Sequence, residues 1–150
     1  MIVVEGTIRG KQRPRFNTKN GRAFTPSQTI NYENWIKQCY IEQSNRLLNG
    51  PIRARIEIYY SVPKSYFKTK RKIETIKDGI DYPMKKPDAD NIAKIVLDSL
   101  NKIAYEDDKQ VVELTVIKRW TFDNERIEFE VEEIKWTDIY VLIILMVCYL

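Results

Sequence analysis

Two short acidic segments carry the residue types and spacing from which a reaction centre could be built. Asp88 and Asp90 are two positions apart, where an extended stretch is expected to turn into a helix. Asp107 and Asp108 come just before a predicted strand that begins at Val111. Carboxylates brought together repel one another unless a cation lies between them. Asp88, Asp90, Asp107 and Asp108 are therefore candidate metal ligands.

The chain contains no histidine, and this limits its chemistry. Ser-His and Cys-His nucleophiles and imidazole metal sites are excluded. Ligation by oxygen alone favours hard cations, so Mg²⁺ is the expected cofactor and Mn²⁺ a substitute. A Mg²⁺ ion held by aspartates can activate water and polarise a phosphate. Lys94 lies four residues after Asp90 on the same helical face, where it could neutralise charge developing on that phosphate.

Simpler roles exist for each acid taken alone. Asp88 or Asp90 could cap the helix and complement its dipole, and Asp107 with Asp108 could form a solvated turn. A calcium loop of the EF-hand type is a poor fit for the segment that starts at Asp88. Its sixth position would be Ala93 instead of glycine, and its twelfth Ser99 instead of glutamate.

Charge is divided unevenly along the chain, although the net charge is only +4. Residues 1–87 contain 18 Lys and Arg against 7 Asp and Glu, whereas residues 88–150 contain 7 against 14. A basic half joined to an acidic half favours a polyanion held beside a metal site. The candidate DNA contacts are cations and one aromatic residue that could stack on bases: Lys11, Arg13, Arg15, Phe16, Lys19, Arg22, Lys85 and Lys86. A second run of cations lies at residues 64–72, where the alternative is an ordinary solvated surface.

The elements that would position these residues can be outlined from the sequence. Strands are predicted at residues 2–9, 52–62, 111–120 and 126–134, with Ile52, Ala54, Ile56, Ile58 and Tyr60 on one face. A long loop is expected at 10–25, and helices at 26–48 and 88–101, the first with a buried stripe of Trp35, Ile36, Tyr40, Gln43 and Leu47. Residues 65–78 are expected to be basic and helical. The predicted fold is a small single α+β domain at residues 1–136, with a mixed sheet and two main helices packed on it.

Residues 137–150 form a separate apolar tail of unknown role. Its run from residue 139 to 150 is too short to cross a bilayer, which needs about 20 residues. We expect it to pack as a terminal element on the core or on a second subunit, and no membrane partner is expected. Cys39 and Cys148 form no metal spacing, and the first residues do not read as a secretory signal, so a cytoplasmic location is predicted.

The motifs resemble the RusA family of Holliday junction resolvases. The resemblance spans about residues 2–134 and rests on Lys86-Pro87-Asp88-Ala89-Asp90-Asn91 with Lys94, on Asp98-Ser99-Leu100-Asn101, on Asp107-Asp108-Lys109-Gln110-Val111-Val112, and on Arg13-Pro14-Arg15-Phe16 with Thr25-Pro26. It implies a homodimer that cuts branched DNA with Mg²⁺. In that case Asp88, Asp90 and Asp108 correspond to the family's essential aspartates and Lys94 to its catalytic lysine. A bacterial phage or prophage origin would fit such a small member.

Three functions are compatible with the sequence. The first is a Mg²⁺-dependent endodeoxyribonuclease that resolves four-way junctions by paired cuts in recombination and repair. The second is a non-catalytic DNA-binding module whose acids are structural caps. The third is a nuclease for other branched DNA, such as flaps. Metal-dependent cleavage separates the first from the second, and the choice of DNA substrate separates the first from the third.

Overall fold

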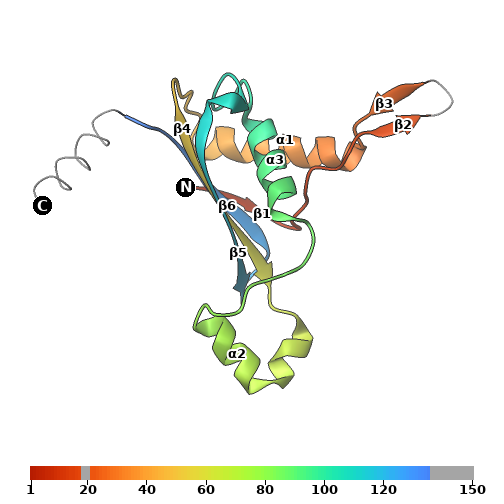
Figure 1. Cartoon of the computed structure of the whole chain (residues 1–150), viewed down its shortest axis with the longest axis vertical. Helices are drawn as coiled ribbons and strands as arrows, with labels where there is room; N and C mark the ends of the chain where they lie inside the picture. The colour runs from red at the N-terminus through yellow and green to blue at the C-terminus, as the bar shows by residue number, and fades with distance from the viewer. Residues whose placement is uncertain (18–20, 136–150) are drawn as a thin grey trace, which may run out of the picture.

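The computed structural model describes residues 1–17 and 21–135, which form one α+β domain (Figure 1). The predicted fold class is confirmed. The elements, in chain order, are β1 (Ile2–Glu5), β2 (Arg15–Asn17), β3 (Arg22–Phe24), α1 (Ser27–Gln43), β4 (Ile52–Ser61), the 3-10 helix η1 (Lys64–Lys68), α2 (Lys70–Lys77), α3 (Ala89–Leu100), the 3-10 helix η2 (Asp108–Gln110), β5 (Val111–Thr121) and β6 (Arg126–Glu133). The apolar tail at residues 137–150 lies outside the described residues.

The main sheet has four strands in the order β1-β6-β4-β5. β6 pairs antiparallel with both β1 and β4, whereas β4 and β5 are parallel, so the sheet is mixed as predicted. Parallel neighbours need a long crossover connection. Here the crossover contains η1, α2, α3 and η2, so the chain between β4 and β5 carries both acidic segments.

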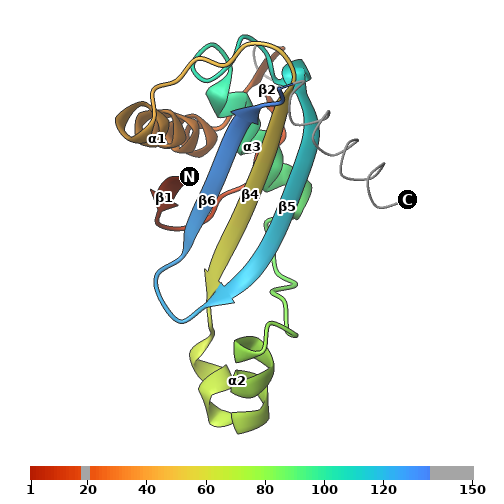
Figure 2. The ribbon, with the colours of Figure 1, turned by 90° about the vertical axis from the view of Figure 1, so that its left-hand side faces the viewer.

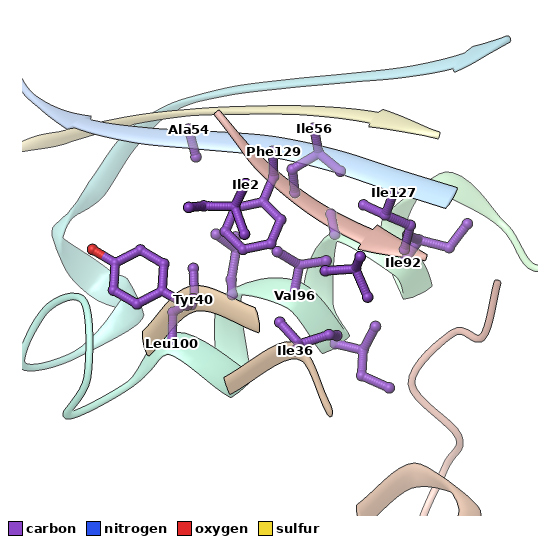
Figure 3. Close-up of a cluster of buried hydrophobic side chains, with 14 of the residues drawn as sticks. Ile2, Ile36, Tyr40, Ala54, Ile56, Ile92, Val96, Leu100, Ile127 and Phe129 are labelled. Carbon is purple, nitrogen blue, oxygen red and sulfur yellow. The ribbon is translucent and has the colours of Figure 1, made fainter. Parts of the chain in front are cut away.

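The face of the sheet that contacts the helices is apolar, because successive side chains along a strand point to opposite faces. On β4, the side chains predicted for one face are all buried, and they alternate with less buried polar residues. Facing them, α1 and α3 cover the same side of the sheet (Figures 1 and 2). Fully buried side chains such as Ile56, Ile92 and Phe129 meet between these layers (Figure 3). Each stabilises the fold by about 1.5–3 kcal/mol relative to exposure.

Helix α1 differs from its prediction in its length and in its buried face. It ends at Gln43 and not near residue 48, and no side chain caps its start. Its buried residues are Thr29, Tyr32, Ile36, Cys39 and Tyr40. Of the predicted stripe only Ile36 and Tyr40 are buried, while Trp35 and Leu47 are exposed. Leu47 faces outward because the chain leaves the helix before reaching it.

The segment predicted as a loop at residues 10–25 contains a small structure of its own. β2 and β3 pair antiparallel, with Arg15 opposite Phe24 and Phe16 opposite Ala23. The resulting β2–β3 hairpin projects from the body at the end of the molecule remote from α2 (Figures 1 and 2). Three-residue strands have little hydrophobic alternation, so the sequence carried only a weak signal for them.

Candidate active site

Most of helix α3 is buried, but one side of the helix carries a short row of polar side chains. Seven of its twelve residues are buried, from Ile92 to Leu100. Asp90 and Lys94 are exposed, whereas Asn91 and Asp98 are half-buried. Because residues four apart lie on one helical face, Asp90, Lys94 and Asp98 form a row along the helix. The hydrophobic pattern of α3 therefore orients Asp90, Lys94 and Asp98 away from the core.

Asp88 occupies the N-cap position of α3 without acting as a cap. Its backbone is extended, and its side chain makes no capping hydrogen bond. The carboxylate is exposed, and it forms no ion pair or hydrogen bond with any residue that the structure describes. The helix dipole favours a negative charge at this place. The structure therefore leaves the Asp88 carboxylate available for an external ligand.

The start of α3 is held by the N-terminal loop and by the end of β4. The backbone N–H of Lys11 donates to the Asn91 carbonyl at 2.8 Å, and Tyr60 Oη donates to the Pro87 carbonyl at 3.4 Å. A Cβ at Gly10 would come within 2.8 Å of Pro87 Cβ, which only glycine avoids. A pocket of about 500 Å³ lies in this region, lined by Ile8, Arg9, Gly10, Lys11, Gln12, Lys86, Pro87, Asp88 and Asn91.

The second acidic segment separates into two roles. Asp107 is the N-cap of η2: its side chain accepts from Lys109 N at 3.0 Å, and Gln110 completes a capping box. Asp108 makes no such capping bond and is half-buried. Capping therefore accounts for Asp107, for which the sequence had suggested a solvated turn, while Asp108 remains a candidate for chemistry.

Asp108 is brought to the far end of α3 by the loop that precedes it. Tyr105 is fully buried and donates from Oη to the Leu97 carbonyl at 2.9 Å, which ties the loop to the helix. Burial raises the pKa of Asp108, and the charges of Asp98 and Asp107 and a hydrogen bond with Asp98 raise it further, against the lowering effect of Lys94. Asp98 and Asp108 thus form a close pair of carboxyl groups beside Lys94.

Lys11 lies in an ion-pair network, and its predicted contact with DNA stays a prediction. Its Nζ pairs with Glu33 of α1 and with Asp98 Oδ2 of α3, the latter at 3.0 Å. Burial alone would lower the pKa of Lys11, but hydrogen bonds and charges from Glu33 and Asp98 outweigh it and raise the pKa. Lys11 therefore links two helices and holds the Asp98 carboxylate next to Asp108.

The acidic groups fit a hard divalent cation by their chemistry, although they do not form a compact cluster here. Asp88 and Asp98 are ten residues apart along α3, which is about 15 Å at 1.5 Å per residue. Among residues 1–17 and 21–135, no three Asp, Glu or Cys side chains are grouped closely enough to hold a metal ion. The donors are all carboxylates, and the Asp98–Asp108 pair is a place where a cation would relieve repulsion.

The residues predicted to contact DNA fall into three groups. Arg13, Arg15 and Phe16 are exposed on or beside the β2–β3 hairpin, and Arg22 lies on its second strand. Lys86 is exposed beside Asp88, whereas Lys85 pairs with Glu125 at 3.0 Å and lies over the Tyr60 ring. Lys19 lies outside the described residues.

Sequence reasoning gave no role to Asp98 or Glu33. For Asp98 a signal existed, because it lies four residues after Lys94 and eight after Asp90, on the same helical face. For Glu33 no local signal existed, since its partner Lys11 is 22 residues away along the chain. A pocket of about 680 Å³ lies between the end of α1 and the end of β6, and none of the candidate catalytic residues lines it.

The described residues thus form an α+β domain in which acidic side chains lie along and beside one helix, α3. Residues 5–132 match the family described as "Endodeoxyribonuclease RusA", and the chain belongs to this family of endodeoxyribonucleases. It is also similar to "Uncharacterized protein YqaN" of Bacillus subtilis (strain 168), with 31% identity over 136 residues. That alignment covers 89% of this chain and 95% of the relative. None of the helices in the described part is long and apolar enough to cross a membrane.

Proposed function

We propose that the protein is a Mg²⁺-dependent endodeoxyribonuclease that resolves four-way DNA junctions in recombination and repair. The observation that carries this proposal is the row of polar groups on α3, in which Asp90 and Lys94 are exposed, preceded by an Asp88 carboxylate that no capping bond occupies. Membership of the RusA family adds the class of reaction and the branched DNA substrate. The missing capping bond at Asp88 supports this proposal over a non-catalytic module whose acids serve only as caps.

In this proposal Asp88 and Asp90 hold a metal ion at the start of α3, and Asp108, which lies beside Asp98 farther along the helix, holds a second one. Asp107 acts only as a cap. Mg²⁺, or Mn²⁺ in its place, would supply Lewis-acid activation of the phosphate and of water. Lys94 sits between the two acidic ends of α3, where its ammonium can bind a phosphate oxygen and offset charge that grows during cleavage. Lys11, Glu33 and Asp98 orient the Asp108 side of the site.

The partner of the site is branched DNA, bound by a homodimer. Support for a dimer comes from the surface: β5 is an edge strand, with Val112 62% and Leu114 48% exposed. Ile30, Trp35 and Ile41 of α1 are also exposed. A bacterial setting agrees with the relative in Bacillus subtilis, while a cytoplasmic location and a phage or prophage origin stay predictions.

A cleavage assay tests the function directly. The protein is mixed with a four-way junction, a flap and a linear duplex of the same sequence, each with Mg²⁺, with Mn²⁺ and with a chelator. We expect paired symmetric cuts in the junction only when a divalent cation is present. Binding without cleavage in every metal would support the non-catalytic module. Preferential cutting of the flap would assign the enzyme to another class of branched DNA.

A further inference from the structure

The connection between β4 and α3 contains a basic projection that the proposed chemistry does not use. Residues 64–77, comprising η1 and α2 and here called the basic arm, lie beyond the end of the main sheet (Figures 1 and 2). Six cations belong to this arm: Lys64, Lys68, Lys70, Arg71, Lys72 and Lys77, against one acid, Glu74. The arm therefore has a net charge of +5, and the rest of the chain has −1, since the total is +4.

The cations of the basic arm differ in their ion pairing from many cations on the body of the domain. Arg53, Arg119 and Arg126 each pair with a carboxylate on the sheet. None of the six arm cations forms an ion pair with a residue in the described part of the chain, and all six are exposed. Lys72 lies over the Tyr66 ring at 3.6 Å, which is a contact within the arm. Unpaired exposed charges of one sign create a field that attracts a polyanion.

The basic arm is packed by aromatic contacts against the end of β5 and the residue that follows it. Tyr66 meets Trp120 edge-on with ring centroids 5.6 Å apart, and Phe67 meets Phe122 at 6.1 Å. Ile76 is buried on the inner side of α2. The charges are therefore presented by a packed element and not by a loose charged run, which limits the entropy lost when they bind a ligand.

The arm also has a defined relation to the candidate active site. The chain leaves α2 and returns through residues 78–87 directly to Asp88. This return segment is tied to β5 and to the turn before β6, because Lys118 Nζ donates to the Lys85 carbonyl at 2.6 Å and Lys85 pairs with Glu125. The start of α3 lies between the basic arm and the β2–β3 hairpin along the long axis of the molecule (Figure 1).

We propose that the basic arm binds the phosphate backbone of a duplex arm of the branched DNA, away from the bond that is cut. The inference rests on the proposed function and deepens it by dividing the substrate between two surfaces. The acidic row on α3 acts at the branch, and the basic arm supplies affinity through phosphate contacts that do not depend on sequence. Loss of the arm charges therefore weakens binding and leaves the chemical step intact.

The test compares two variants that remove the same charge. The arm variant is Lys68→Gln, Lys70→Gln and Arg71→Gln, which keeps helix-forming residues and avoids the Lys72–Tyr66 contact. The control variant is Lys37→Gln, Arg46→Gln and Lys135→Gln, whose cations lie outside both the arm and the site. Binding is measured with a chelator present, over a salt series, on junctions with long duplex arms and with arms cut back close to the branch.

We expect the arm variant to bind the long-armed junction at least about tenfold more weakly than wild type, with a salt slope smaller by about 2–3. The control variant should keep the wild-type slope. On the short-armed junction, wild type and arm variant should bind alike. Lys68→Arg with Lys70→Arg should bind like wild type, and equal thermal unfolding midpoints would show that all variants are folded. Single-turnover cleavage at saturating protein should be unchanged.

Two results would overturn the inference. One is an arm variant with the wild-type affinity and salt slope on the long-armed junction. The other is a loss of binding to vesicles of acidic phospholipid with no loss of DNA binding, which would assign the arm to a membrane surface. Failure of the proposed function is a separate result, because it appears as absence of cleavage by wild type with Mg²⁺, whatever the binding curves show.

Discussion

At the scale of single residues, the structure distinguishes aspartates that look alike in the sequence. Asp88 stands at an N-cap position with a free carboxylate, whereas Asp107 stands at an N-cap position and uses its carboxylate as the cap. Asparagine caps a helix about as well as aspartate but carries no charge. Substitution by asparagine therefore separates a capping role from a metal-binding role.

The first prediction uses this difference. Asp88→Asn, Asp90→Asn and Asp108→Asn should each lower the cleavage rate by about 100-fold or more, because metal activation contributes several kcal/mol. Asp107→Asn should keep the cleavage rate within a few-fold of wild type, since the cap is retained. Single-turnover rates on a four-way junction across a Mg²⁺ titration provide the measurement. Equal losses for Asp107→Asn and Asp108→Asn would contradict the separation of their roles.

The second prediction concerns Lys11 as a positioning residue. Lys11→Met leaves Glu33 and Asp98 facing each other without their cation, which should cost about 1–3 kcal/mol of unfolding free energy. It should also raise the Mg²⁺ concentration needed for half-maximal cleavage, while Lys11→Arg restores both properties. The salt slope of junction binding should not change. If the slope instead fell by about 0.9, Lys11 would be a phosphate contact as the sequence first indicated.

At the scale of elements, the β2–β3 hairpin and the basic arm project from one core at its two ends. Each carries exposed cations, and the hairpin adds the exposed ring of Phe16. The hairpin differs from the arm because it is continuous with the loop that packs on Pro87 and Asn91 through Gly10. Contacts made by the hairpin are therefore expected closer to the branch point than those of the arm.

The third prediction tests the hairpin. Arg13→Ala with Arg15→Ala should weaken junction binding on all sequences and lower the salt slope by about 2, one for each lost phosphate contact. The effect should persist on junctions with short duplex arms, where the basic-arm variant has none. A double variant that binds like wild type over the whole salt series would show that the hairpin does not contact phosphates.

At the scale of the whole molecule, the described part of one chain supplies one acidic row, which under the proposed function makes one cut at a time. A four-way junction needs two related cuts, and a two-fold dimer places two sites on a two-fold substrate. The exposed edge of β5 and the exposed residues of α1 offer apolar surface for such a contact. The homodimer is a proposal that the mixing of subunits can test.

The fourth prediction is that mixed dimers nick without resolving. Asp90→Asn preserves shape but removes a charge that the metal needs. Wild-type dimers should convert a supercoiled plasmid carrying a cruciform to linear product, and wild-type chains mixed with Asp90→Asn chains should accumulate nicked circles. A protein that sediments as a monomer under cleaving conditions and still linearises the plasmid in one binding event would rule out the dimer.

The sequence by itself determined the parts of this protein that depend on short-range pattern. Alternation along β4 predicted that strand and its buried face, and α3 was predicted as a helix over residues 88–101. The row formed by Asp90 and Lys94 follows from helical spacing. These inferences need only neighbours within one or two turns, so no knowledge of the packing was required.

Tertiary structure alone decided which residues meet across the chain. Lys11 and Asp98 are 87 residues apart, and they come together because the N-terminal loop packs between α1 and α3. Asp98 lies beside Asp108 because buried Tyr105 ties the intervening loop back to Leu97. Such pairings depend on how the layers pack, and no local pattern encodes them. For the same reason, only the structure separated the free carboxylate of Asp88 from the capping carboxylate of Asp107.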